Sequence, residues 1–79
     1  MISEHEAQVI AQKFLDQRFT TLTFRFGPTP QRAPNDWGMV FDRITPEGSV
    51  LDGPIVVLVD KQTGRARTLE QAIEEGWRG

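Results

Sequence analysis

The amino-acid sequence predicts a small α+β fold, in which an N-terminal helix packs on an antiparallel sheet of three to four strands and a short C-terminal helix follows. Near the N-terminus, apolar residues recur every three or four positions, as in an amphipathic helix. Further along, they alternate or run unbroken in short stretches separated by glycine and proline, which indicates strands joined by turns. We expect the 79 residues, positions 1–79, to form one domain.

The predicted first helix begins after Ser3. The Ser3 hydroxyl can accept a hydrogen bond from the amide of Glu6, and the Glu6 side chain can reach back, which makes a capping box. One stripe of this helix should face the core, with the stem of the Arg18 side chain covering its end. The stripe contains Ala7, Ile10, Ala11, Phe14 and Leu15.

We expect this helix to pack on two strands in which apolar and polar residues alternate. From Thr20 the period changes to two, and one side of this strand carries Leu22, Phe24 and Phe26. Residues 27–36, from Gly27 to Asp36, are rich in proline and include an Asn-Asp pair, so we expect a surface loop there. A second strand runs to about Ile44, and its helix-facing side carries Trp37, Met39 and Phe41.

The stretch Ile55–Val59 is unbroken and rich in β-branched residues, which predicts a strand in the middle of the sheet with both faces covered. A hairpin turn should follow, because the Asp60 carboxylate can accept from turn amides and Gly64 can adopt a positive φ. The last strand is then expected to run from Arg65 to about Thr68.

A short C-terminal helix is predicted after this strand, because Thr68 and Gln71 repeat the capping pattern and Gly76 can end the helix. One side of this helix carries Leu69, Ala72, Ile73 and Trp77.

The sheet face turned away from the first helix also needs cover, because it carries the apolar residues Val40, Val56 and Leu58. Either the C-terminal helix covers them through Ile73 and Trp77, or a second subunit does. Both interpretations bury the same residues, and we favour a homodimer.

Composition and charge argue against two classes of partner. Nine basic and eleven acidic residues give a net charge of −2, so we expect neither nucleic acid nor a membrane as a partner. A single-strand nucleic-acid binder would expose the aromatic residues around Arg25, whereas burial in the core explains them without a ligand. The absence of cysteine and an acidic start, where a secretory signal would be basic, favour a cytoplasmic location.

The residue inventory does not favour catalysis or a metal site. His5 is the only histidine, and cysteine and tyrosine are absent, so no pattern for a nucleophile with its base is found. Glu4, His5 and Glu6 are neighbours in one helical turn and point apart instead of converging on a metal ion. Three aspartates are better explained as turn and surface residues: Asp42, Asp52 and Asp60. We expect no enzymatic activity, no catalytic residue, no metal and no cofactor.

The order of several motifs resembles a bacterial family. A strand led by Trp37 is followed by Gly53 and Pro54, which enter a valine-rich strand that ends in the turn from Asp60 to Gly64. Together with the N-terminal helix, this order is similar to the small YrhB-like and cystatin-like immunity-protein domains of polymorphic toxin systems. The resemblance implies a helix packed across an antiparallel sheet, no catalysis, and binding to a protein partner, either a toxin domain or a client.

We therefore expect a non-enzymatic protein-binding module. The candidate surface is the polar face of the sheet near residues 27–34, and its partner-binding residues are Thr21, Thr23, Arg25 and Arg43. The alternative is a small-ligand-binding domain, or a minor enzyme, with a pocket between helix and sheet. An open polar pocket with two converging carboxylates would favour that alternative, and a closed core would favour protein binding.

Overall fold

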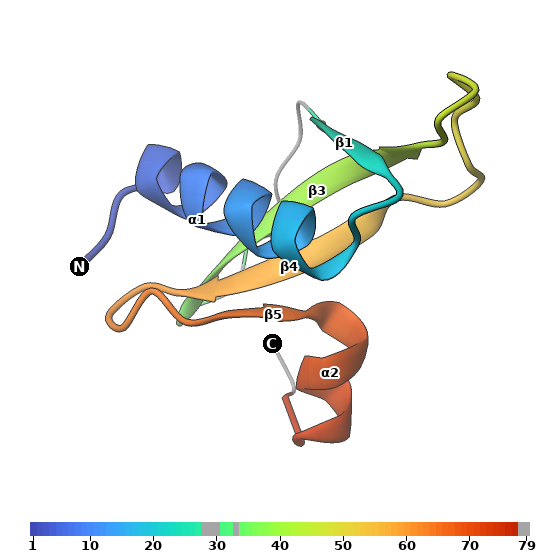
Figure 1. Ribbon diagram of the computed structural model, residues 1–79. Coiled ribbons are helices and arrows are strands. Elements are labelled where there is room, and N and C mark those ends of the chain that lie inside the picture. Colours follow the sequence, from blue (N-terminus) through green and yellow to red (C-terminus); the bar gives the residue numbers. More distant parts are fainter. Residues whose placement is uncertain (28–30, 33, 78–79) are drawn as a thin grey trace.

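A long helix lies along one face of an antiparallel sheet and a short helix follows the last strand (Figure 1), which confirms the predicted α+β fold. The computed structural model describes residues 1–27, 31–32 and 34–77. The strand order across the sheet is β1-β3-β4-β5, and β2 also pairs with β3. In chain order the elements are α1 (Glu4–Arg18), β1 (Thr23–Phe26), β2 (Gln31–Arg32), β3 (Asp36–Ile44), β4 (Ile55–Asp60), β5 (Ala66–Thr68) and α2 (Leu69–Glu74).

Helix α1 begins as predicted. The Ser3 hydroxyl accepts from the Glu6 amide at 3.1 Å and the Glu6 carboxylate accepts from the Ser3 amide at 3.1 Å, so the capping box is complete. The Ser3 hydrogen bonds hold the pKa of the Glu6 carboxyl below its ordinary value. Trp37 Nε1 donates to the Ile2 carbonyl at 3.1 Å, and the Ile2 amide donates to the Lys61 carbonyl at 2.8 Å. These bonds fix the start of α1 at one end of the sheet.

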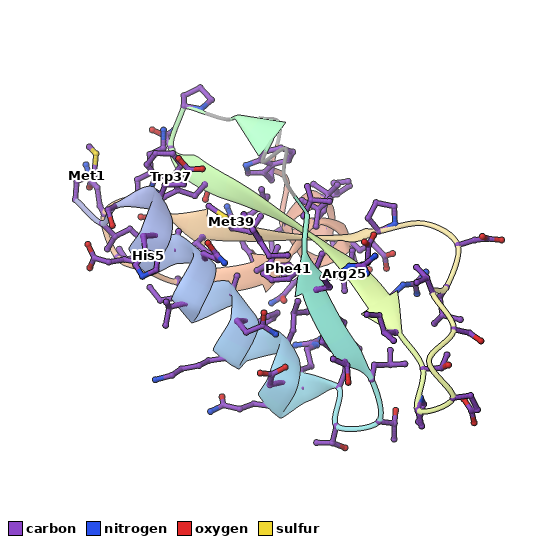
Figure 2. All side chains as sticks on the ribbon, turned by 90° about the horizontal axis from the view of Figure 1, so that it is seen from above. Met1, His5, Arg25, Trp37, Met39 and Phe41 are labelled. Carbon is purple, nitrogen blue, oxygen red and sulfur yellow. The ribbon has the colours of Figure 1, made fainter. Side chains whose placement is uncertain are left out.

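The contact between α1 and the sheet is made mainly by Ala7, Ala11 and Leu15, each with 0% of its surface exposed. Ile10 and Phe14 of the predicted stripe are half-buried beside them. We call the covered side of the sheet the inner face and the other side the outer face. As predicted, the inner face carries Leu22, Phe24, Phe26, Trp37, Met39 and Phe41. Figure 2 shows three of them, Trp37, Met39 and Phe41, in succession along β3.

The predicted loop over residues 27–36 is wrong in part, because it contains β2 and the first residue of β3. Strand β3 has nine residues and β1 has only four, and β1 pairs with the far half of β3. The edge of β3 near Trp37 and Gly38 is therefore open to a second partner, and β2 pairs with these two residues. Backbone hydrogen bonding of this kind leaves no apolar pattern in the sequence. Residues 28–30 and 33 lie outside the described residues.

The hairpin between β4 and β5 forms as predicted. Asp60 Oδ1 accepts from the amides of Thr63 at 2.9 Å and Gln62 at 2.8 Å. These two bonds, with Thr63 first, hold the pKa of the Asp60 carboxyl below its ordinary value. Gly64 has a φ of +76°, a conformation that strains other residues. The turn places β5, and α2 after it, beside β4.

Helix α2 covers part of the outer face. It contacts β4 and β5, and Ala72 of α2 and Leu58 of β4 are 0% and 1% exposed. In the alternative in which the C-terminal helix provides this cover, the part given to Ile73 is wrong, because the short helix turns Ala72 toward the sheet and leaves Ile73 58% exposed. Val40 and Val56, which pair across β3 and β4, are half-buried. A homodimer through this face stays a prediction.

Replacing Leu15 with alanine tests the packing of α1. We expect the free energy of unfolding to fall by about 2 to 5 kcal/mol, because the change opens a cavity under the helix. Urea denaturation followed by circular dichroism measures this loss. Val9, on the same helix and 44% exposed, supplies the control, since Val9→Ala should change stability by no more than about 0.5 kcal/mol. Similar losses in both variants would contradict the packing described.

Candidate functional site

An open groove of about 420 Å³ lies at the C-terminal end of α1. The end of α1, the start of β1, the entry to β4 and the first turn of α2 form its walls. Its charged lining residues are Arg18, Arg43 and Glu70. Its apolar lining residues are Phe19, Leu22, Phe24, Pro54, Ile55, Val56 and Leu69. The groove therefore combines an apolar floor with charged side chains of both signs.

The floor follows from how the chain leaves α1. The Phe19 amide donates to the Leu15 carbonyl at 2.8 Å and ends the helix. A short turn then leads through Leu22 into β1, so that Phe19 and Phe24 come together with their ring centroids 5.9 Å apart. Leu15 is fully buried, whereas Phe19 and Leu22 are half-buried. The closed core therefore ends, and the groove begins, in the short segment between Leu15 and Leu22.

Arg43 belongs to this groove and not to the outer face on which it was predicted. It pairs directly with Phe24 across β1 and β3, and opposed residues of an antiparallel sheet share a face. The prediction was wrong because the alternation that places Phe41 on the inner face places Arg43 there too. Arg43 Nη2 donates to the carbonyls of Asp52 at 2.7 Å and Gly53 at 3.0 Å, and Nε donates to Gly53 at 3.3 Å. These bonds hold the guanidinium against the connection between β3 and β4.

Arg18, the last residue of α1, also lines the groove. Its guanidinium carbon lies 5.6 Å from the ring centroid of Phe14 and 5.9 Å from that of Phe19. Guanidinium groups are attracted to aromatic faces at such distances. Arg18 therefore sits over the end of the apolar stripe, as predicted, and contributes a charge to the groove as well.

The other three predicted partner-binding residues lie away from the groove. Thr23 and Arg25 are exposed on the outer face of β1, and Thr21 is exposed in the turn before it. Arg25 Nη2 lies 3.0 Å from Asp42 Oδ2, on the strand opposite. The structure thus brings Thr23 and Arg25 to one face and separates both from Arg43. Their role in binding stays a prediction.

The first turn of α2 forms one wall of the groove. Thr68 Oγ1 accepts from the Gln71 amide at 3.1 Å, which confirms the predicted cap. At the other end of α2, Gly76 has a φ of +93° and the Trp77 amide donates to the Ala72 carbonyl at 2.8 Å. This arrangement is a Schellman motif, which turns the chain back on the helix. It positions Trp77 to contact the sheet.

A buried carboxylate ties this end of α2 to the sheet. Asp36 is 3% exposed, Trp77 Nε1 donates to its Oδ2 at 3.1 Å, and Arg67 Nη2 lies 3.5 Å from its Oδ1. Arg67 and Arg65 also pair with Glu75, at 3.1 Å and 3.0 Å. This network holds α2 against the sheet and thereby fixes one wall of the groove. Asp36 was not predicted as a buried residue, because nothing around it in the sequence indicates partners that come from β5 and the end of α2.

The residues considered for chemistry do not converge. His5 is exposed at the start of α1, Asp42 pairs with Arg25, and Asp60 accepts from its own turn. Within residues 1–27, 31–32 and 34–77, no three histidine, aspartate or glutamate side chains lie together as metal ligands would. In the groove, one carboxylate, Glu70, accompanies two guanidinium groups among the described lining residues.

The network around Glu75 makes stability depend on pH. The hydrogen bonds from Arg65 and Arg67 hold the pKa of Glu75 below its ordinary value of 4.5. A lowered pKa in the folded state stabilises the fold above pH 4.5, and this contribution is lost as pH falls through the folded-state pKa.

We expect Glu75→Gln to be less stable than the wild type near neutral pH, and the difference to shrink as pH falls below about 4.5. Urea denaturation at a series of pH values measures this difference in the free energy of unfolding. Glu74→Gln, a change at the neighbouring exposed position, is the control and should change the free energy of unfolding by no more than about 0.5 kcal/mol. If the difference between Glu75→Gln and the wild type stayed the same at every pH, the pairing of Glu75 with Arg65 and Arg67 would not contribute to stability.

Comparison with known proteins gives no indication of what binds in the groove. No protein-family model, curated protein or solved structure matches this chain. The similarity to YrhB-like and cystatin-like immunity-protein domains therefore stays a prediction from the sequence. Neither helix of the described chain has the length and apolar character needed to cross a membrane.

Proposed function

We propose that this chain is a non-enzymatic protein-binding module whose groove receives a segment of a partner protein. The observation that carries the proposal is the contrast between the closed core and the groove. Ala7, Ala11 and Leu15 seal α1 onto the sheet, whereas Phe19 and Leu22 stay half-buried beside two arginines. An apolar surface left accessible next to positive charge is a feature of interaction sites.

The composition of the groove also supports a protein partner. Aromatic residues and arginine are enriched among the residues that contribute most to protein interfaces. The groove carries both kinds, with Phe19 and Phe24 in its floor and Arg18 and Arg43 at its sides. Two converging carboxylates would have favoured the enzyme alternative, and the carboxylate that lines the groove among the described residues is Glu70 alone.

The resemblance noted in the sequence narrows the class of partner. Immunity-protein domains bind toxin domains, and the related alternative is a client of a small chaperone-like module. On this proposal the partner is a cytoplasmic protein of one of these two kinds. A net charge of −2 favours a protein over a nucleic acid as the partner.

A second candidate function is the binding of a small molecule. The volume of about 420 Å³ favours it, because pockets for small ligands occupy roughly 300 to 1,000 Å³. The two functions differ in what the groove contacts in the cell, and a cross-linking experiment separates them.

A photo-reactive phenylalanine analogue placed at Glu70, on the exposed rim of the groove, tests protein binding. Expressed in the native cells and irradiated, this variant should yield a covalent product with a discrete partner. The same analogue at Val9, which is exposed on α1 and does not line the groove, should yield no such product.

Equal products at both positions, or none at Glu70, would contradict docking in the groove. In the second case, a metabolite mixture that raises the melting temperature of the purified chain would establish the small-molecule function instead.

A further inference from the structure

The arginines whose side chains the structure describes divide into two groups by their partners. Three described arginines pair with carboxylates: Arg25 with Asp42 at 3.0 Å, Arg65 with Glu75 at 3.0 Å, and Arg67 with Asp36 and Glu75 at 3.5 and 3.1 Å. Within the described part of the chain, neither Arg18 nor Arg43 has a carboxylate within ion-pair distance, and both line the groove.

Arg43 is held in place but is only partly used as a donor. Its Nε and Nη2 carry three of the five guanidinium N–H groups, and their three hydrogen bonds go to the carbonyls of Asp52 and Gly53. In the described chain no acceptor is found for the two N–H groups of Nη1. Since the carbonyls are neutral, they orient the guanidinium and leave its charge without a counter-charge. A pre-oriented arginine loses little side-chain freedom when it binds a ligand.

Arg18 is the second arginine that lines the groove. It contacts the rings of Phe14 and Phe19, and Phe19 is also part of the groove floor. A carboxylate that approaches Arg18 therefore comes next to an aromatic surface. An apolar side chain beside that carboxylate can pack on Phe19 and Leu22.

The charge of the groove is positive on a negative chain. Two arginines and one glutamate line it, whereas the whole chain has a net charge of −2. Glu70 would repel a ligand with many negative charges, such as a nucleic acid. A ligand with one carboxylate and adjacent apolar groups fits this balance best.

We infer that the groove recognises an acidic side chain, aspartate or glutamate, that lies next to a large apolar side chain in a segment of the partner protein. This inference rests on the proposed function and specifies the chemistry of its partner. The carboxylate binds between Arg18 and Arg43 through charge-assisted hydrogen bonds, which are stronger than neutral ones. The apolar side chain fills the floor.

Two short peptides test this chemistry directly. Both are acetylated and amidated, so that they carry no terminal charge, and both place a central residue between two leucines. The central residue is glutamate in one and glutamine in the other. Titration into the ¹⁵N-labelled chain, followed by NMR, should shift the amide signals of the groove and give an affinity about tenfold higher for the glutamate peptide. This preference should weaken as the salt concentration rises.

Variants of the chain show which arginines bind the carboxylate of the peptide. Arg43→Gln and Arg18→Gln should each lower the affinity for the glutamate peptide about tenfold and leave that for the glutamine peptide nearly unchanged. Lys13→Gln removes a positive charge from an exposed position of α1 that does not line the groove, so this variant is the control and should bind both peptides as the wild type does. Arg18 is exposed at the end of a helix, so its replacement tests the inference even if Arg43→Gln disturbs the neighbouring loop.

Equal affinities for the two peptides would overturn the inference, as would a Lys13→Gln effect as large as that of Arg18→Gln. So would the absence of any shift in the groove at millimolar peptide. If a partner cross-links at Glu70 while the peptides bind alike, docking in the groove stands and carboxylate recognition fails. If the glutamate peptide binds as expected but no protein cross-links, the chemistry of the groove stands and the proposed protein partner fails.

Discussion

The structure depends on how much of the sheet one helix can cover. Helix α1 has 15 residues, a length of about 22 Å, whereas β3 has nine residues, a length of about 30 Å. The contacts of Ile2 with Trp37 and Lys61 fix the start of α1 at one end of the sheet. The helix therefore ends before the inner face does, and the uncovered part becomes the groove.

For this reason the two ends of the molecule are packed differently. Near the start and middle of α1, alanines let the helix lie close to the sheet, and Met39 and Val57 beneath it are fully buried. Past the end of α1, the wall of the groove is built from α2, a helix of only six residues. So short a helix is not stable alone, and the buried Asp36 with Trp77 holds it to the sheet. The tightly packed part of the small core and the groove proposed for binding are thus neighbouring but separate.

Local signals predicted most of the fold correctly. The cap at Ser3, the turn at Asp60 and the cap at Thr68 each depend on residues within four positions of one another. The alternation of strand residues predicted the inner face for the same reason, and applied strictly it would have placed Arg43 there too. The groove and the Asp36 network were not predictable, because they depend on how segments distant in sequence are placed in space. No period or motif in one sequence encodes that placement.

We propose the groove at the end of α1 as the docking site, and a substitution that fills the groove from within tests this proposal. Leu22 is half-buried in the groove floor, so Leu22→Trp places a larger apolar side chain where the partner segment would lie. Co-purification of the partner from the native cells is measured for this variant and the wild type, after thermal melting has shown both to be folded. If the partner docks in the groove, the variant melts at or above the wild-type temperature and retains no partner. A folded variant that still retains the partner at the wild-type level would contradict it.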